Sequence, residues 1–109
     1  MAADLTTTLA ALTDPTRRAV VQRLALGPAT ASQLAQLAPI SRPAVSQHLR
    51  VLREAGLVRA TPSGRHLWYE LGGAPLLEAQ RWLGDLTERW AAAPTHLDAT
   101  ADPRAKEPR

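Results

Sequence analysis

Cysteine is absent from this sequence of 109 residues. Its absence excludes disulfide bonds, redox-active thiols, a cysteine nucleophile and thiolate metal ligands. A site for soft metals is excluded with them, because those metals select sulfur ligands. The lack of cysteine also fits a reducing compartment, and we expect the protein to be cytoplasmic.

Aromatic side chains and long apolar runs are scarce as well. Aromatic residues make up 4% of the chain, although 45% of it is hydrophobic. The core is therefore expected to consist of Leu, Ala and Val, which suits the packing of helix on helix. No apolar run approaches the roughly 18–20 residues that span a bilayer, and the N-terminus lacks the positive segment of a signal peptide. We expect no membrane partner.

Positive charge is concentrated in one half of the chain. The net charge is only +3, yet seven arginines and two carboxylates lie between residues 14 and 60. Residues 75–109 carry six acidic and five basic side chains. Such an excess is expected of a face that meets phosphate groups, although a solvated basic surface is an equally common explanation.

Capping and turn residues divide the N-terminal half of the chain into four predicted helices. Leucines three to four residues apart over residues 5–12 predict the first helix. The Asp-Pro pair at 14–15 is typical of the start of a second helix, and the Gly-Pro pair at 27–28 of its end. Thr30 and Gln33 fit a capping box for a short third helix.

The third helix is expected to bury Leu34 and Leu37 and to stop at Pro39. Ser41 is a suitable N-cap for a fourth helix, which Gly56 ends. The third and fourth predicted helices are therefore two short helices joined by a tight turn, as in a helix-turn-helix unit.

The fourth predicted helix has two chemically different faces. Val45, Leu49 and Leu52 recur at i, i+4 and i+7 and are expected to be buried. In a DNA major groove, glutamine can pair with adenine, arginine with guanine, and serine with base edges or phosphate. The alternative is an amphipathic surface helix whose polar face is only solvated. The opposite, polar face carries Arg42, Ser46, Gln47, Arg50 and Arg53, with His48 at its flank.

Two strands and a final helix are expected after Gly56. The strands run over 57–61 and 66–71, joined by turn residues at 62–64. The last helix extends from Ala74 through about Ala92. Residues 93–109 are rich in alanine, proline and alternating charge, and we expect a largely disordered tail.

The second predicted strand alternates in hydrophobicity, with Leu67, Tyr69 and Leu71 expected on its buried side. The predicted order is thus four helices, two strands and a helix. This is a mainly α fold with a small β-hairpin, the winged helix-turn-helix arrangement, with residues 1–92 as one domain for DNA binding and dimerisation.

Three motifs in the chain resemble those of the ArsR/SmtB family of bacterial winged-helix repressors. They are the Asp-Pro-Thr-Arg-Arg sequence at 14–18, the string at 41–58 that contains Ser-Gln-His-Leu, and the wing sequence formed by Gly64-Arg65 with 69–71. The similarity covers about residues 5–92. It implies a homodimer that binds palindromic double-stranded operator DNA, usually to repress transcription, through helix 41–55 in the major groove and the wing at 62–66.

The resemblance also assigns roles to single residues. It implies base reading by Ser46, Gln47 and His48, phosphate or base contacts by neighbouring polar residues, and a minor-groove or phosphate contact by Arg65. The full set of predicted DNA-binding residues, from the resemblance and from the polar face of the fourth helix and the wing, is Ser41, Arg42, Pro43, Ser46, Gln47, His48, Arg50, Arg53, Arg65 and His66.

Structural alternatives exist for several of these residues. Ser41 is an N-cap whether or not it also meets DNA. Arg53 and Arg65 are as well explained by solvation. Two roles are open for Arg17 and Arg18 of the upstream motif, which are outside that set: they bind DNA, or they fix the second helix to its neighbours.

Apolar side chains of the first and last helices are candidates for a dimer interface, because a chain this short leaves apolar surface uncovered. The alternative is that they pack only within one subunit. The candidates are Leu5, Leu9, Leu12, Leu76, Ala79, Leu83, Leu86 and Trp90.

The chain departs from the metal-sensing members that this family contains. The third-helix stretch at 32–36 has no cysteine, and the last helix has Asp85 and Glu88 but no histidine. We therefore expect no metal and no other cofactor. We also expect no enzyme activity, because the sequence has no paired nucleophile and base and no phosphate loop.

Two alternative functions remain open at this point. The three tryptophans are expected in core or dimer packing, but Trp82 or Trp90 could line an apolar pocket for an unidentified small-molecule effector. A winged-helix module that binds protein is the other alternative. The retained polar and basic face of the fourth helix argues against it, since protein interfaces favour aromatic residues and methionine.

Overall fold

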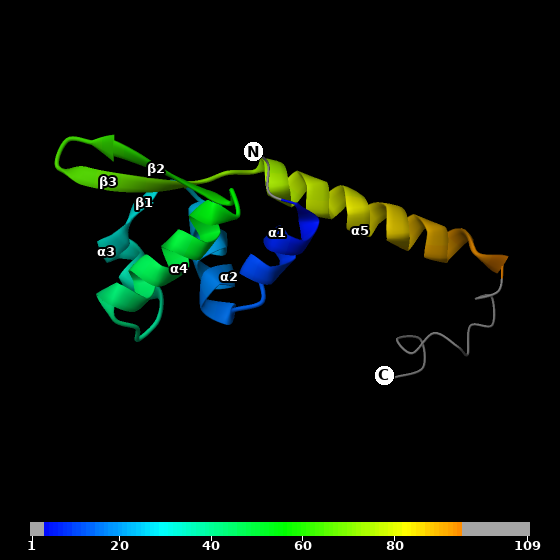
Figure 1. Ribbon diagram of the computed structural model, residues 1–109, viewed down its shortest axis with the longest axis horizontal. Coiled ribbons are helices and arrows are strands. Elements are labelled where there is room, and N and C mark those ends of the chain that lie inside the picture. The colour runs from blue at the N-terminus through cyan, green and yellow to red at the C-terminus, as the bar shows by residue number, and fades with distance from the viewer. Residues whose placement is uncertain (1–3, 95–109) are drawn as a thin grey trace. The chain divides into compact units, whose positions relative to one another are not determined.

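The computed structural model describes residues 4–94, so the predicted tail lies almost wholly outside the described residues. The chain divides into two units, Met1–Ala79 and Gln80–Arg109. The final helix runs through the boundary between them. Figure 1 labels the elements: α1 Leu5–Ala11, α2 Pro15–Leu24, β1 Ala29–Thr30, α3 Ala31–Leu34, the 3-10 helix η1 Ala35–Leu37, α4 Arg42–Glu54, β2 Val58–Ser63, β3 His66–Leu71 and α5 Ala74–Ala92.

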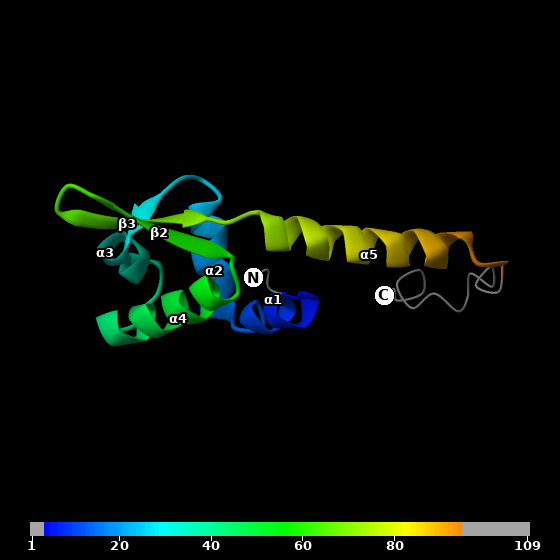
Figure 2. The ribbon, with the colours of Figure 1, turned by 45° about the horizontal axis from the view of Figure 1, so that its top comes forward.

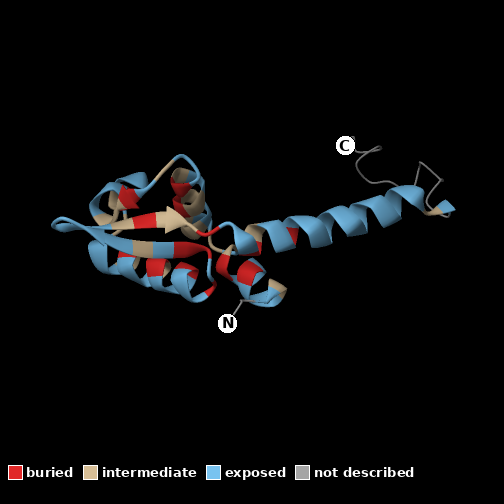
Figure 3. Ribbon diagram, turned by 90° about the horizontal axis from the view of Figure 1, so that it is seen from above, coloured by how far each residue is buried: buried red, intermediate tan, exposed pale blue. Residues whose placement is uncertain are grey.

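The winged helix-turn-helix prediction is confirmed: α3 and α4 precede a β-hairpin, and helices dominate. Figures 1 and 2 place α3 and α4 together on one side of the sheet. The hydrophobic core lies between these layers and is made almost entirely of aliphatic residues, with Tyr69 as its one buried aromatic side chain among those described. Figure 3 shows the buried positions as single stripes on α2, α4 and the strands.

The capping residues of the first two helices set where each begins. The Asp14 carboxylate accepts hydrogen bonds from the backbone N–H of Thr16 at 2.7 Å and of Arg17 at 3.1 Å, as the sequence predicts. These bonds hold the pKa of Asp14 below its ordinary value of 3.8, and the bond from the Arg17 N–H contributes most. Asp4 caps α1 in the same way through the backbone N–H of Thr7, a cap that the leucine spacing does not indicate.

The cap at Asp14 is expected to make folding sensitive to acid. A carboxyl whose pKa is lowered in the folded protein stabilises it above the unfolded pKa, and this contribution disappears as the pH falls through the folded pKa. Asp14→Ala should lower the urea midpoint at about pH 7, and this loss should shrink as the pH falls below 3.8 and then through the lower pKa of the folded protein. Asp14→Asn, which keeps the accepting oxygen, is the control. A loss that stays the same throughout an acid titration would contradict this account.

The capping box of the third helix is confirmed in both directions. Thr30 Oγ1 accepts from the Gln33 N–H, and the Gln33 side chain accepts from the Thr30 N–H at 2.9 Å. Leu34 is fully buried, but the prediction that Leu37 is buried was wrong, because 40% of it is exposed. The α-helix ends at Leu34, and Leu37 is the last residue of the 3-10 helix η1, whose tighter winding breaks the α-helical spacing that the prediction assumed.

The sheet contains a strand that the sequence did not predict. β1 pairs antiparallel with β3, with Ala29 opposite Tyr69 and Thr30 opposite Trp68, and the strand order is β1-β3-β2. β1 has only two residues, too few for a periodic pattern.

The hairpin turn lies later than predicted. Pro62 and Ser63 belong to β2, and the two-residue turn is Gly64-Arg65. Gly64 has a φ of +64°, and no described non-glycine residue has a positive φ. A positive φ at the first turn position alone is the type II′ geometry, for which glycine is required.

The outer half of the hairpin extends beyond the core. Tyr69 and Leu71 are buried or half-buried, as predicted, whereas Leu67 is exposed, contrary to prediction. Leu67 is opposite Pro62 near the turn, and β1 reaches only as far as Trp68. Alternation therefore gives the correct side of the strand, but the body of the domain ends before Leu67.

Candidate nucleic-acid interface

Helix α4 holds its polar face outward because its apolar face is buried. The exposed fractions of Val45, Leu49 and Leu52 are 1%, 2% and 0%, which confirms the predicted buried side. Ser41 caps the helix by accepting a hydrogen bond from the Ala44 N–H at 3.2 Å. Six of the predicted DNA-binding residues of α4 are exposed: Arg42, Pro43, Ser46, Gln47, Arg50 and Arg53.

Arg42 connects the two helices of the helix-turn-helix unit. Its Nη1 donates to Ser32 Oγ of α3 at 3.1 Å, and both residues are exposed. The sequence did not suggest this contact. It fixes the first turn of α4 relative to α3 while the guanidinium remains accessible to solvent.

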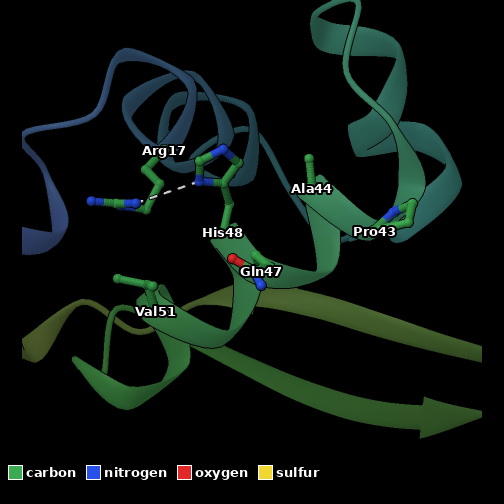
Figure 4. Close-up of a pocket in the computed structure, with 6 residues that line it drawn as sticks. All are labelled: Arg17, Pro43, Ala44, Gln47, His48 and Val51. Atoms are coloured by element: carbon green, nitrogen blue, oxygen red, sulfur yellow. Dashed lines mark hydrogen bonds between the residues drawn. The ribbon is translucent and has the colours of Figure 1, made fainter.

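His48 differs from its neighbours on α4, because it is half-buried at the flank of the helix that faces α2. Its Nδ1 lies 3.4 Å from Arg17 Nη1 (Figure 4). An arginine guanidinium can only donate, so Nδ1 accepts and the ring proton of the neutral imidazole is on Nε2. The structure thus brings together the exposed residues of α4, with His48 turned partly away from them.

The two arginines of the Asp-Pro-Thr-Arg-Arg motif both join α2 to the end of α1. Arg17 Nε donates to the Ala11 carbonyl at 2.7 Å, and Arg18 Nη1 to the Leu12 carbonyl at 2.8 Å. Of the two readings that the sequence left open for these arginines, fixing α2 to its neighbours matches these contacts. The contact of Arg17 with His48 spans 31 positions, and no local pattern indicates it.

The wing carries two exposed polar side chains beside a half-buried tryptophan. Arg65 is in the turn and His66 follows it, both exposed. The His66 ring lies edge-on to Trp68, with 6.2 Å between ring centroids. Arg59, at the base of the hairpin, is instead paired with Glu70 at 3.1 Å.

The candidate dimer residues fall into two groups. Ala79 is 6% exposed, and Leu12 and Leu76 pack against the core, so these three contact their own chain and have little area left for a partner. Leu5 is half-buried. The exposed group consists of Leu9, Leu83, Leu86 and Trp90, of which Leu83 and Leu86 are each 50% exposed.

Several hollows in the described part of the unit Met1–Ala79 are large enough for a small group. One, of about 270 Å³, lies beside α4 and is lined by Arg17 and His48 among others. A second, of about 370 Å³, is lined by Pro28, Thr61, Ser63, Trp68 and Glu70. Both are open to solvent, and an effector pocket at Trp82 or Trp90 stays a prediction.

Within residues 4–94, no three histidine or carboxylate side chains are grouped as metal ligands would be. Nor does any helix in that range have the length and hydrophobicity needed to cross a bilayer.

Comparison with known proteins gives a consistent result. Residues 12–60 match a family described as a helix-turn-helix domain. The chain is 47% identical over 85 residues to the transcriptional regulator Rv2034 of Mycobacterium tuberculosis, covering 78% of this chain and 77% of that protein. It is 33% identical to the transcriptional repressor SdpR of Bacillus subtilis, covering 67% and 81%.

Solved structures agree in fold. The crystal structure of an ArsR family transcriptional regulator matches with a TM-score of 0.75 and 34% identity, over 85% of this chain and 99% of that one. An ArsR-like regulator from Rhodococcus sp. RHA1 matches with a TM-score of 0.72 and 33% identity, over 90% and 92%.

Proposed function

The chain belongs to the ArsR/SmtB family of helix-turn-helix transcriptional regulators, and on this premise we propose that it is a homodimeric repressor of a two-fold symmetric operator. In this proposal each protomer lays α4 in the major groove and its wing along the adjacent backbone. The release of repression does not use cysteine, since the chain has none.

The observation that carries the proposal is that α4 has a buried apolar face and an exposed polar face. Buried Val45, Leu49 and Leu52 fix the helix, so the polar groups opposite them are held in a defined orientation. Gln47 can make paired hydrogen bonds with adenine, and Arg50 with guanine. Arg42 and Ser41 lie at the start of the helix, where contacts to phosphate set its register.

The proposal of a homodimer is supported by the apolar stripe on α5. Residues 82, 83, 86 and 90 follow each other at helical spacing, and all four side chains are between 43% and 50% exposed in the single chain. Exposed apolar surface of this kind marks a protein interface. A two-fold dimer would place two copies of α4 about 34 Å apart, one turn of DNA.

Selection of bound duplexes from a random pool tests the proposal. We expect an inverted repeat with half-sites one turn apart, bound with an affinity on the order of nanomolar that falls steeply with salt. Recovery of unrelated sequences, or binding that does not change with salt, would contradict it. Capture of a stable protein partner by a chain that retains no DNA would instead favour the protein-interaction alternative.

Arg65→Ala should weaken binding to every sequence by a similar factor. Arg65 is exposed in the turn of the wing, and in the proposed complex it neutralises a phosphate. A dimer loses two such contacts, so the slope of log affinity against log salt should become less negative by about two. Fluorescence anisotropy at several salt concentrations measures this slope.

Arg59→Ala is the matched control for Arg65, since this arginine of the same hairpin is already paired with Glu70. It should change the slope much less. An equal change in both variants, or a loss confined to the operator sequence, would contradict the assignment of Arg65 to phosphate.

A further inference from the structure

The hollow beside α4 places an arginine and a histidine next to the polar groups that face DNA in the proposed function. Its volume is about 270 Å³, and it lies where α2 approaches the first half of α4 (Figure 4). The residues that line it are Arg17, Pro43, Ala44, Gln47, His48 and Val51.

Arg17 is held in this hollow by three separate acceptors. Its Nε donates to the Ala11 carbonyl at 2.7 Å, its Nη2 to the Ala10 carbonyl at 3.4 Å, and its Nη1 to His48 Nδ1 at 3.4 Å. A guanidinium has five N–H groups, so two of them are not used by these acceptors. Because the side chain is already fixed, binding an anion would cost little of the conformational entropy that a free arginine loses.

His48 is oriented by the same contact. The bond from Arg17 occupies Nδ1 and leaves the neutral ring with its proton on Nε2. The imidazole therefore has a donor at a fixed position on the edge away from Arg17. A histidine without this partner would exchange between tautomers and donate from Nε2 only part of the time.

The Asp14 carboxylate is the acidic group that faces this pair from the start of α2. It accepts the backbone N–H groups of Thr16 and Arg17. The backbone hydrogen bond from Arg17 is the largest cause that lowers the pKa of Asp14, and the positive charge of the Arg17 guanidinium adds to it. No ion pair joins Asp14 to the Arg17 guanidinium among the described residues, so Asp14 does not occupy the N–H groups that remain.

We propose that Arg17 and His48 form a subsite for one backbone phosphate of the bound DNA, with Arg17 supplying the charge and His48 Nε2 a second donor. This proposal rests on the proposed function, since it concerns the DNA that α4 reads. Arg17 thereby has a double role: it joins α1, α2 and α4, and it contacts the ligand. His48 contacts the backbone in this assignment, whereas the family resemblance suggests base reading.

Salt titrations of Arg17→Gln test the charge of the subsite, with the DNA duplex selected by the unaltered protein as the probe. We expect the affinity for operator and for unrelated DNA to fall by the same factor, and the log–log salt slope to become less negative by about two. Arg18→Gln is the matched control, because the neighbouring arginine also donates to a carbonyl at the end of α1 but does not line the hollow.

Two isosteric variants of His48 test the donor. Glutamine places its amide group near the position of Nε2, whereas asparagine places its amide near Nδ1 and provides nothing at Nε2. His48→Gln should therefore retain more affinity than His48→Asn. The opposite order would mean that only the contact with Arg17 matters and would overturn the phosphate role of His48.

Neutral methylphosphonate links, placed one at a time along the selected duplex, locate the contact. At one position per half-site, neutralisation should weaken binding by the unaltered protein and by Arg18→Gln, but should not weaken binding by Arg17→Gln further. If every position affects all three proteins alike, the subsite does not exist.

Thermal unfolding and sedimentation show whether Arg17→Gln has lost its fold or its dimer. If it has, Arg17→Lys, which retains the positive charge, is used in its place. The lysine variant should then keep the unaltered salt slope, and a slope reduced as in a neutral variant would count against the subsite. If the unaltered protein binds no DNA specifically, the proposed function itself fails. If it binds and the two arginine variants behave alike, only the subsite is wrong.

Discussion

A chain with both Leu83→Glu and Leu86→Glu should be a monomer and should bind the operator at least about 100-fold more weakly than the unaltered protein. Both leucines are 50% exposed in the single chain, so neither substitution removes core packing. In a dimer they would place four carboxylates in an apolar interface, where unpaired charge is strongly disfavoured. The loss of affinity follows because two linked recognition helices gain about 10²–10⁴ over one by avidity.

Leu77→Glu is the matched control for the dimer prediction. Leu77 lies on the same helix and is 53% exposed, but helical periodicity places it on a different face from Leu83 and Leu86. It should remain a dimer and bind normally. Sedimentation velocity and operator titration measure both variants, and a double variant that stays dimeric would show that α5 is not the interface.

Gln47→Ala should abolish most of the preference for the selected operator while leaving binding to unrelated DNA almost unchanged. A paired hydrogen bond between a side chain and a base edge is worth about 1–3 kcal/mol of discrimination. A dimer loses two of them, so discrimination at the two symmetric positions should fall at least about 30-fold. Gln47 is exposed on α4 and has no protein partner on which folding depends among the contacts described.

Val51→Ala provides the comparison for Gln47. Val51 lines the same hollow and is also exposed on α4, but it has no hydrogen-bonding group. Repeating the selection with each variant gives the base preference directly. If Gln47→Ala recovers the original operator unchanged, Gln47 does not read bases, and the specificity must come from Ser46 and Arg50 or from the shape of the DNA.

The features that could be predicted from the sequence are those encoded within a few residues. The N-cap at Asp14, the capping box of Thr30 and Gln33, and the buried stripe of α4 each depend on residues within two helical turns. The hairpin was predicted from its strand pattern. Its turn was misplaced because proline and serine are common both in turns and at the edge of a sheet.

What the sequence could not predict depends on tertiary contacts. β1 exists only because Ala29 and Thr30 align with the central strand, and Leu67 is exposed because the core ends before it. The same holds for the site. The side chains of Arg17 and His48 meet across 31 positions, and the contact of Arg42 with Ser32 depends on how α3 and α4 cross.

The central claim, that a pair of α4 helices reads a two-fold operator, is tested most directly by titrating the purified protein against the selected duplex and against the same duplex with one half-site scrambled. Anisotropy gives the affinity, and sedimentation of the complex gives the number of chains bound. The account predicts two chains on the intact site and an affinity at least about 10³-fold above that for unrelated DNA, most of which is lost when one half-site is scrambled. Equal affinity for the intact, half-scrambled and unrelated duplexes would contradict it.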